Sequence, residues 1–196
     1  MKAWHFTGAN KRLRHGDGRD IKSGRTLKVQ GSLAMCNYGL HASKRLIDAL
    51  RYAPGTYVWR VELGGDIVRD DDKFVASERT ALWGYDATDV LRAFARRCAL
   101  DVVGLWDAPE QVVEYLRTGD ESICAAASSA ARDAARDAAS AARDAASAAR
   151  DASAARAAWD ARDAAWAAWD AAWDARDAWA AKQNRCLTSM IAAHRP

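Results

Sequence analysis

The chain has no glycine and no proline between Gly119 and its terminal Pro196. These two residue types interrupt helices most strongly, so nothing in this stretch is expected to end one. From about Cys124 to Ala181 the sequence consists almost wholly of Ala, Arg, Asp, Ser and Trp. Since Ala has the highest helix propensity, we expect one long helix from about Asp120 to beyond Ala181.

Long apolar runs are also missing. Arg or Asp interrupts every Ala run, so no stretch of about 18 apolar residues is present to cross a membrane. The first residues, MKAWHFTGANKR, do not contain the apolar segment of a signal peptide. We therefore expect a soluble, cytoplasmic protein without a membrane partner.

Sites for metals and known catalytic loops are absent as well. The four cysteines form no close pair and no zinc spacing, and the four histidines form no metal-binding pair. No serine elbow and no phosphate-binding glycine loop occurs. We expect free thiols, no metal and no cofactor, and motifs alone assign no enzyme class. The cysteines are Cys36, Cys98, Cys124 and Cys186.

Charge is distributed unevenly along the chain. Residues 1–51 carry eleven Lys or Arg against three Asp, whereas residues 52–124 carry eight basic and fourteen acidic side chains. The basic first third can attract phosphate on a nucleotide or a nucleic acid. Alternatively, its charges face the acidic middle third within one fold. We do not expect nucleic acid as the partner.

Short strands are expected to dominate the first 85 residues. Residues 2–7 read as a strand, 27–30 and 33–36 as a hairpin, and 56–63 as the clearest strand because apolar and polar residues alternate. Further strands are expected over 73–76 and 80–83. One helix over 44–52, capped by Ser43, interrupts them.

Helices follow from Asp86 onward. A second start signal is Asp107 with Pro109 and Glu110, whose helix stops at Gly119, and Asp120 can cap the next. The predicted fold is α+β: a small mixed or antiparallel sheet with packed helices, followed by one long Ala-rich helix. We expect a globular domain over residues 1–119 and a helical region for oligomerisation over residues 120–196.

The Ala-rich region carries a tryptophan ladder. Trp159, Trp166 and Trp173 lie seven residues apart, with Trp169 and Trp179 nearby. A seven-residue spacing is typical of a coiled-coil seam, and each Trp can bury about 150–250 Å². We expect self-association through these five residues. The alternatives are that the helix folds back onto the globular part or stays solvated.

A candidate ligand site combines two short segments. His5 and Thr7 lie in the first strand, and His41 and Ser43 lie in the run Tyr38-Gly-Leu-His-Ala-Ser43. Each segment puts a histidine beside a hydroxyl residue, although a lone histidine in a strand is also often a hydrogen-bonded core residue. Basic side chains that can balance a phosphate are close in sequence. They are Lys11, Arg12 and Arg14.

The chain from Lys2 to Asp120 resembles a family of small uncharacterised proteins of phages and bacteria with a Gly-Leu-His-Ala-Ser motif and an Ala/Trp-rich C-terminal helix. The resemblance implies a phage setting and a shared α+β domain, without an established activity. The segments that carry it are residues 2–4, 36–43, 48–55, 61–62, 65–67, 73–79 and 183–185.

A weaker resemblance is to ADP-ribosyltransferases, through His5-Phe-Thr7 and the Gly39-Leu40 strand. It implies that His5 holds a ribose, His41 stacks near nicotinamide, and Glu62 or Glu78 stabilises the transition state. His41 stands where that family has a tyrosine.

Three functions therefore remain open. The first is a non-enzymatic phage accessory protein that binds a nucleotide-like ligand or a host protein and multimerises through its helix. The second is an NAD-dependent transferase, and the third is a structural self-assembling protein.

Overall fold

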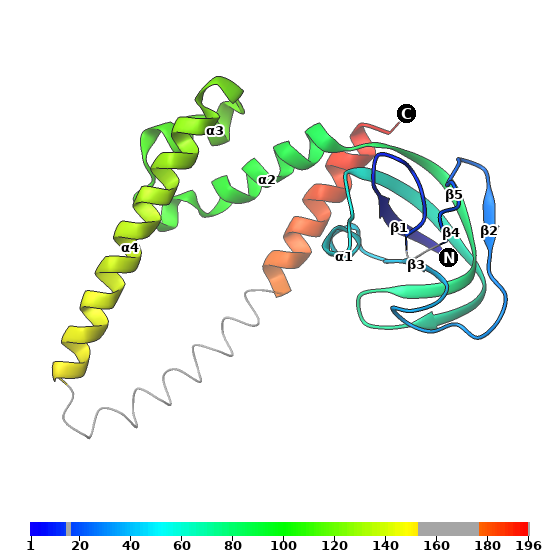
Figure 1. Ribbon diagram of the computed structural model, residues 1–196. Helices are drawn as coiled ribbons and strands as arrows, with labels where there is room; N and C mark the ends of the chain where they lie inside the picture. Colours follow the sequence, from blue (N-terminus) through cyan, green and yellow to red (C-terminus); the bar gives the residue numbers. More distant parts are fainter. Residues whose placement is uncertain (15–16, 153–176, 196) are drawn as a thin grey trace. The chain divides into compact units, whose positions relative to one another are not determined.

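In the computed structural model, which describes residues 1–14, 17–152 and 177–195, the first part of the chain contains five antiparallel strands. They form one sheet in the order β1-β4-β5-β2, and β3 pairs with β5 beside β2 (Figure 1). The strands are β1 (Lys2–Thr7), β2 (Thr26–Lys28), β3 (Leu40–Ala42), β4 (Tyr57–Arg69) and β5 (Phe74–Asp86).

The sheet curls until its two edges touch. The pairing of β4 with β5 shifts register between Arg60 and Val61 and between Gly64 and Ile67, and such bulges bend strands and increase their twist. Trp4 of β1 then exchanges two backbone hydrogen bonds with Ser43, just after β3, at 2.8 and 2.9 Å. The sheet is thereby partly closed around an interior.

Apolar side chains fill much of that interior. Trp59 is central among them, and its indole Nε1–H donates to the hydroxyl of Thr7 over 3.0 Å. The hydrogen bond satisfies a polar group that burial would otherwise leave without a partner. The buried cluster consists of Ala3, Ile21, Leu27, Leu40, Ala42, Trp59, Val61, Leu63, Phe74, Ala76 and Ala81.

Two helices pack with the sheet. The first is α1 (Leu46–Arg51), and the second covers residues 177–193. In the second helix Leu187 and Ile191 are fully buried. Asn184 Oδ1 accepts the backbone N–H of Ile47 in the first turn of α1 over 3.1 Å. The C-terminal helix therefore supplies a cap that α1 does not have within its own sequence, because its N-cap residue makes no side-chain cap.

The chain divides into two compact units. The sheet unit comprises Met1–Phe94 with Ala180–Pro196, and the helical unit comprises Ala95–Trp179. The second unit holds more than half of α2 (Thr88–Val102) and the next four elements of the chain. They are η1 (Val103–Leu105), α3 (Glu110–Thr118), η2 (Glu121–Ile123) and α4 (Cys124–Ala152).

The predicted α+β class is confirmed, and several boundaries are corrected. The expected strands over 73–76 and 80–83 form the single strand β5. The segment 33–36 is a turn, with Ala34 bridged to Tyr38, because Cys36 has a left-handed backbone with a φ of 63°. Ser43 does not cap α1, whose N-cap is Arg45.

The long helix also differs from its expected course. It begins at Cys124, after a 3-10 turn that Asp120 caps by accepting the N–H of Ser122. Trp159, Trp166, Trp169 and Trp173 lie outside the described residues, and Trp179 is 46% exposed. Residues 180–196 belong to the same compact unit as the sheet, and Leu187 and Ile191 are buried in it. This division of the chain differs from the expected single boundary at residue 119.

Candidate functional site

A cavity of about 720 Å³ opens in the sheet unit. Its wall combines β1 and β3 with the segments 12–14 and 17–19, the chain after β2, the turn over 36–39 and the end of α1. Small-molecule sites commonly have volumes of about 300–1,000 Å³, so the cavity can hold a ligand of nucleotide size.

Arg79 of β5 places a buried positive charge in this wall. The residue is only 2% exposed, and its Nη1 donates to the backbone oxygen of His41. Its Nη2 is buried without a hydrogen-bond partner in the described part of the chain. Burial lowers the pKa of Arg79 to about 10, so the guanidinium stays charged at neutral pH. Because buried charges are normally paired, this group indicates an anion-binding position.

His5 of β1 lies in the same cavity wall and is half-buried. Its pKa is well below the ordinary value of 6.5, chiefly because burial disfavours the cation and also because Arg79 and His41 are near. Its ring forms no hydrogen bond with any other described residue. At neutral pH the ring is therefore uncharged and can donate one N–H to a ligand.

His41 of β3 also lines the cavity, but the backbone holds both of its ring nitrogens. Nδ1–H donates to the oxygen of Gly39 over 3.2 Å, and Nε2 accepts the N–H of Cys36 over 3.0 Å. These two bonds define the tautomer and hold the turn over 36–39 in place. His41 is thus a residue that shapes the wall and supports Arg79 through its carbonyl.

Six cationic side chains line the cavity, and three of them have acidic partners. Arg12 contacts Asp20 at 3.0 Å, and Lys28 contacts Glu78 at 2.7 Å. Arg14 has no acidic partner among the described residues. The six cationic residues are Arg12, Arg14, Arg19, Lys28, Lys73 and Arg79.

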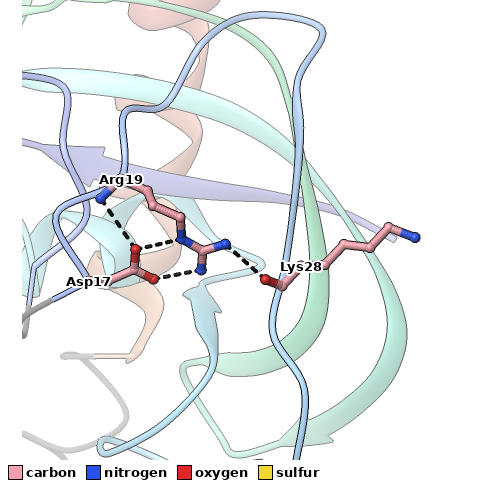
Figure 2. A network of polar contacts seen from close by, with 3 residues as sticks. All are labelled: Asp17, Arg19 and Lys28. Carbon is pink, nitrogen blue, oxygen red and sulfur yellow. Dashed lines mark hydrogen bonds and ion pairs between the residues drawn. The ribbon is translucent and has the colours of Figure 1, made fainter.

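Arg19 is the third paired cation, and it connects the segment 17–19 to β2 through Lys28 (Figure 2). Its guanidinium contacts Asp17 through two hydrogen bonds of 2.6 Å and donates to the backbone oxygen of Lys28 over 2.9 Å. The hydrogen bond from Arg19 lowers the pKa of Asp17, which stays ionised. Asp17 is the only acidic residue among the described residues of the wall, and Arg19 neutralises it.

Two exposed tyrosines also border the cavity. Tyr38 is 43% exposed and Tyr52 is 50% exposed. The hydroxyl of Tyr38 donates to the oxygen of Gln30, and that of Tyr52 donates to Asp72, each over 2.6 Å. Each ring is therefore held in place while much of its surface remains open to a planar ligand.

The structure brings five of the seven predicted ligand-binding residues together. His5, Arg12, Arg14, His41 and Ser43 line the cavity. Thr7 does not, because the residue is only 1% exposed and its hydroxyl accepts a hydrogen bond from the indole N–H of Trp59. Lys11 does not either, since its ammonium lies 4.6 Å from the centre of the Tyr57 ring, beside a separate hollow.

The sequence interpretation missed Arg79, the central residue of the site. With 73–76 and 80–83 taken as separate strands, Arg79 fell into an expected loop. Reading β5 as one strand puts Arg79 on the same face as the buried Ala81, two residues further along. An arginine on the inward face of a strand was the available signal.

The glutamates required for a transferase lie elsewhere. Glu62 is exposed, and Glu78 contacts Lys28. Neither is among the described residues that line the cavity. The described residues also contain no group of three or more His, Cys, Asp or Glu that could hold a metal ion. None of the described helices combines the length and apolar character needed to cross a bilayer.

Residues 1–93 match a family model described as a domain of unknown function, DUF7666. This region contains all of the cavity wall, whereas the helical unit and the C-terminal helix lie beyond it. No curated protein and no solved structure matched the chain.

Proposed function

We propose that the sheet unit is a non-enzymatic binding module for a phosphorylated, nucleotide-like small molecule. The observation that carries this proposal is the buried Nη2 of Arg79, which has no partner among the described residues of a cavity large enough for a nucleotide. Leaving a charged donor unsatisfied is costly, and a phosphate oxygen is the ligand atom that best removes that cost.

The other described wall residues agree with this ligand class. Arg14 adds a second cation without an acidic partner, and His5 adds an uncharged donor. The only acid of the described wall is neutralised by Arg19. A phosphorylated molecule would therefore meet an excess of positive charge, because Asp17 is the one carboxylate of the described wall and is paired with Arg19.

On this proposal the protein acts by sequestering its ligand, in keeping with the phage accessory role suggested by the sequence. A transferase mechanism would need Glu62 or Glu78 in the cavity, and neither lines it. We therefore do not propose catalysis.

The test is to identify what the protein carries. We would purify the chain and its Arg79→Met variant from the same phage-infected cells, denature both, and analyse the released small molecules by mass spectrometry. We expect a phosphorylated compound from the unaltered chain and its loss from Arg79→Met. Arg25→Met is the matched control, because Arg25 is exposed and does not line the cavity. A phosphorylated compound released equally by all three proteins would contradict the proposal.

We also propose that the helical unit mediates self-association. In α4 the side chains of residues 135–144 are all exposed, so the described chain offers this alanine-rich surface no partner. Ala permits close approach of helices, and the tryptophans further along supply apolar area. Sedimentation should show an oligomer that replacement of Trp159, Trp166 and Trp173 by Ala weakens more than replacement of Arg136, Arg143 and Arg150. A monomeric intact protein would contradict this second proposal.

A further inference from the structure

The position of Arg79 restricts which part of a ligand can reach it. Its free nitrogen, Nη2, is buried, and the whole residue is 2% exposed. Its other terminal nitrogen, Nη1, donates to the backbone oxygen of His41, and its charge acts on the His5 ring, so β3 and β1 both lie beside the guanidinium. Because Nη2 is buried, a neighbouring side chain must move aside before a ligand oxygen can bond to it, and a small terminal group requires the smallest movement.

The charges of the cavity wall near Arg79 favour a ligand group with two negative charges. Arg79 and Arg14 are the two guanidinium groups of the described wall that form no ion pair with a described residue, although the Asp17 carboxylate, which is paired with Arg19, also acts on the charge of Arg79. His5 adds a neutral donor next to Arg79. A phosphomonoester carries a charge of about −1.5 to −2 at pH 7, whereas a phosphodiester carries about −1 and has carbon substituents on two sides.

The mouth of the cavity offers a surface for a planar group. Tyr38 is anchored through its hydroxyl and exposes 43% of its surface. Tyr52 is similarly exposed, but the Lys73 ammonium lies 4.8 Å from its ring centre and occupies one face. Aromatic rings in such positions stack nucleobases with little base selectivity, so Tyr38 is the stronger platform.

We infer that the ligand is a nucleoside bearing a terminal phosphomonoester, with its phosphate at Arg79 and His5 and its base stacked on Tyr38 at the mouth. This inference rests on the proposed function and narrows it, because it excludes cyclic and internal phosphodiesters as the preferred ligands.

The experiment is a calorimetric titration of the full chain with matched sets of ligands. Each set contains a nucleoside 5′-monophosphate, its 3′,5′-cyclic monophosphate and the nucleoside, for adenine, guanine, cytosine and uracil. We expect at least one monophosphate to bind about tenfold or more tightly than its cyclic form, in line with the extra negative charge. Arg79→Met should remove this preference, and Arg25→Met should keep it. Arg79→Lys keeps the positive charge but loses the paired donors of the guanidinium, so it should show a weaker preference for the monophosphate. This variant replaces Arg79→Met in the test if Arg79→Met does not fold.

Two further readouts locate the ligand. Cys36 is exposed and lines the cavity, so a bound monophosphate should slow its alkylation by iodoacetamide without slowing that of Cys98, Cys124 or Cys186. Tyr38→Leu should weaken monophosphate binding about tenfold, while Tyr38→Phe retains the ring and should have little effect.

The possible failures are distinguishable. Cyclic forms that bind as tightly as the monophosphates would overturn the inference and leave the proposed function standing. If no nucleotide of either kind binds, both are overturned.

Discussion

The two units of this protein use their residues in opposite ways. In the sheet unit, individual positions make particular contacts: Trp59 donates to Thr7, Asn184 caps α1, and His41 holds the turn at Cys36. In the helical unit, α4 repeats Ala, Arg and Asp, and its side chains from 135 to 144 are all exposed.

The difference indicates where sensitivity to substitution lies. A repetitive, exposed helix depends on backbone propensity, which Ala supplies at every position, so single changes matter little. A partly closed sheet with a buried charge depends on particular residues. The C-terminal helix also depends on particular residues, although it follows the Ala-rich region, because it is packed with the sheet.

The largest effect is expected at the C-terminal helix. Leu187→Ala and Ile191→Ala should each lower the free energy of unfolding by about 2–5 kcal/mol, because both side chains are fully buried. Ala138→Ser on the exposed face of α4 is the control and should change it by less than about 0.5 kcal/mol. Urea unfolding followed by near-ultraviolet circular dichroism measures the difference. Similar losses of unfolding free energy from substitutions in the C-terminal helix and in α4 would contradict the contrast between the two units.

The next effect concerns the glycine at the cavity wall. A Cβ on Gly39 would lie 2.2 Å from a methyl group of Val75, at a φ of 122°. Gly39→Ala should therefore destabilise the protein by about 1–3 kcal/mol through overpacking, in addition to backbone strain. Gly31→Ala separates the two causes, since Gly31 also has a positive φ of 99° but open space around it. Equal melting temperatures for the two variants would show that close packing at Gly39 has no part in the loss.

A third test separates stability from binding inside the sheet unit. Thr7→Val keeps the shape of the side chain but leaves the buried Trp59 indole N–H without its acceptor, at a cost of about 1–3 kcal/mol. Ligand affinity should stay unchanged, because Thr7 does not line the cavity. Arg79→Met should do the reverse and lose affinity, while removal of a buried charge should offset the lost hydrogen bond from Nη1 to the His41 oxygen in the free energy of unfolding. Calorimetry measures the affinity of both variants for the nucleoside 5′-monophosphate. A loss of affinity in Thr7→Val together with an unchanged affinity in Arg79→Met would contradict the roles given to these two residues.

The smallest expected effect is a pH dependence from His5. Its pKa in the folded protein lies well below 6.5, so the unfolded chain takes up a proton as the pH falls through 6.5 and the folded chain does not. The contribution of His5 to stability is therefore full above pH 6.5 and declines as the pH falls below it. Between about pH 7.5 and 5.5, the free energy of unfolding should decline less in His5→Gln than in the unaltered protein. An unchanged decline in that variant would refute the role given to His5.

The parts of this structure that follow from local pattern were predictable. The strand expected over residues 2–7 is β1, alternation identified the first part of β4, and the absence of Gly and Pro identified the helix α4. The histidines His5 and His41 were expected to flank a pocket, and both line the cavity.

What was missed depends on contacts between distant segments. Asn184 caps a turn 137 residues away, and no local signal marks such a pair. The tautomer of His41 and the orphan nitrogen of Arg79 arise only when β3, β5 and the turn at Cys36 meet. Thr7 looked like a ligand residue because its partner, Trp59, is also distant in sequence.

The central claim is that Arg79 binds a phosphate, and the most direct measurement is nitrogen-15 NMR of the protein labelled in arginine. The Nε signal of Arg79 can be assigned by its absence from Arg79→Lys. We predict that it shifts and saturates as a nucleoside 5′-monophosphate is added, while the signal of the exposed Arg25 stays in place. A saturating shift at other arginines with no change at Arg79 would contradict the account.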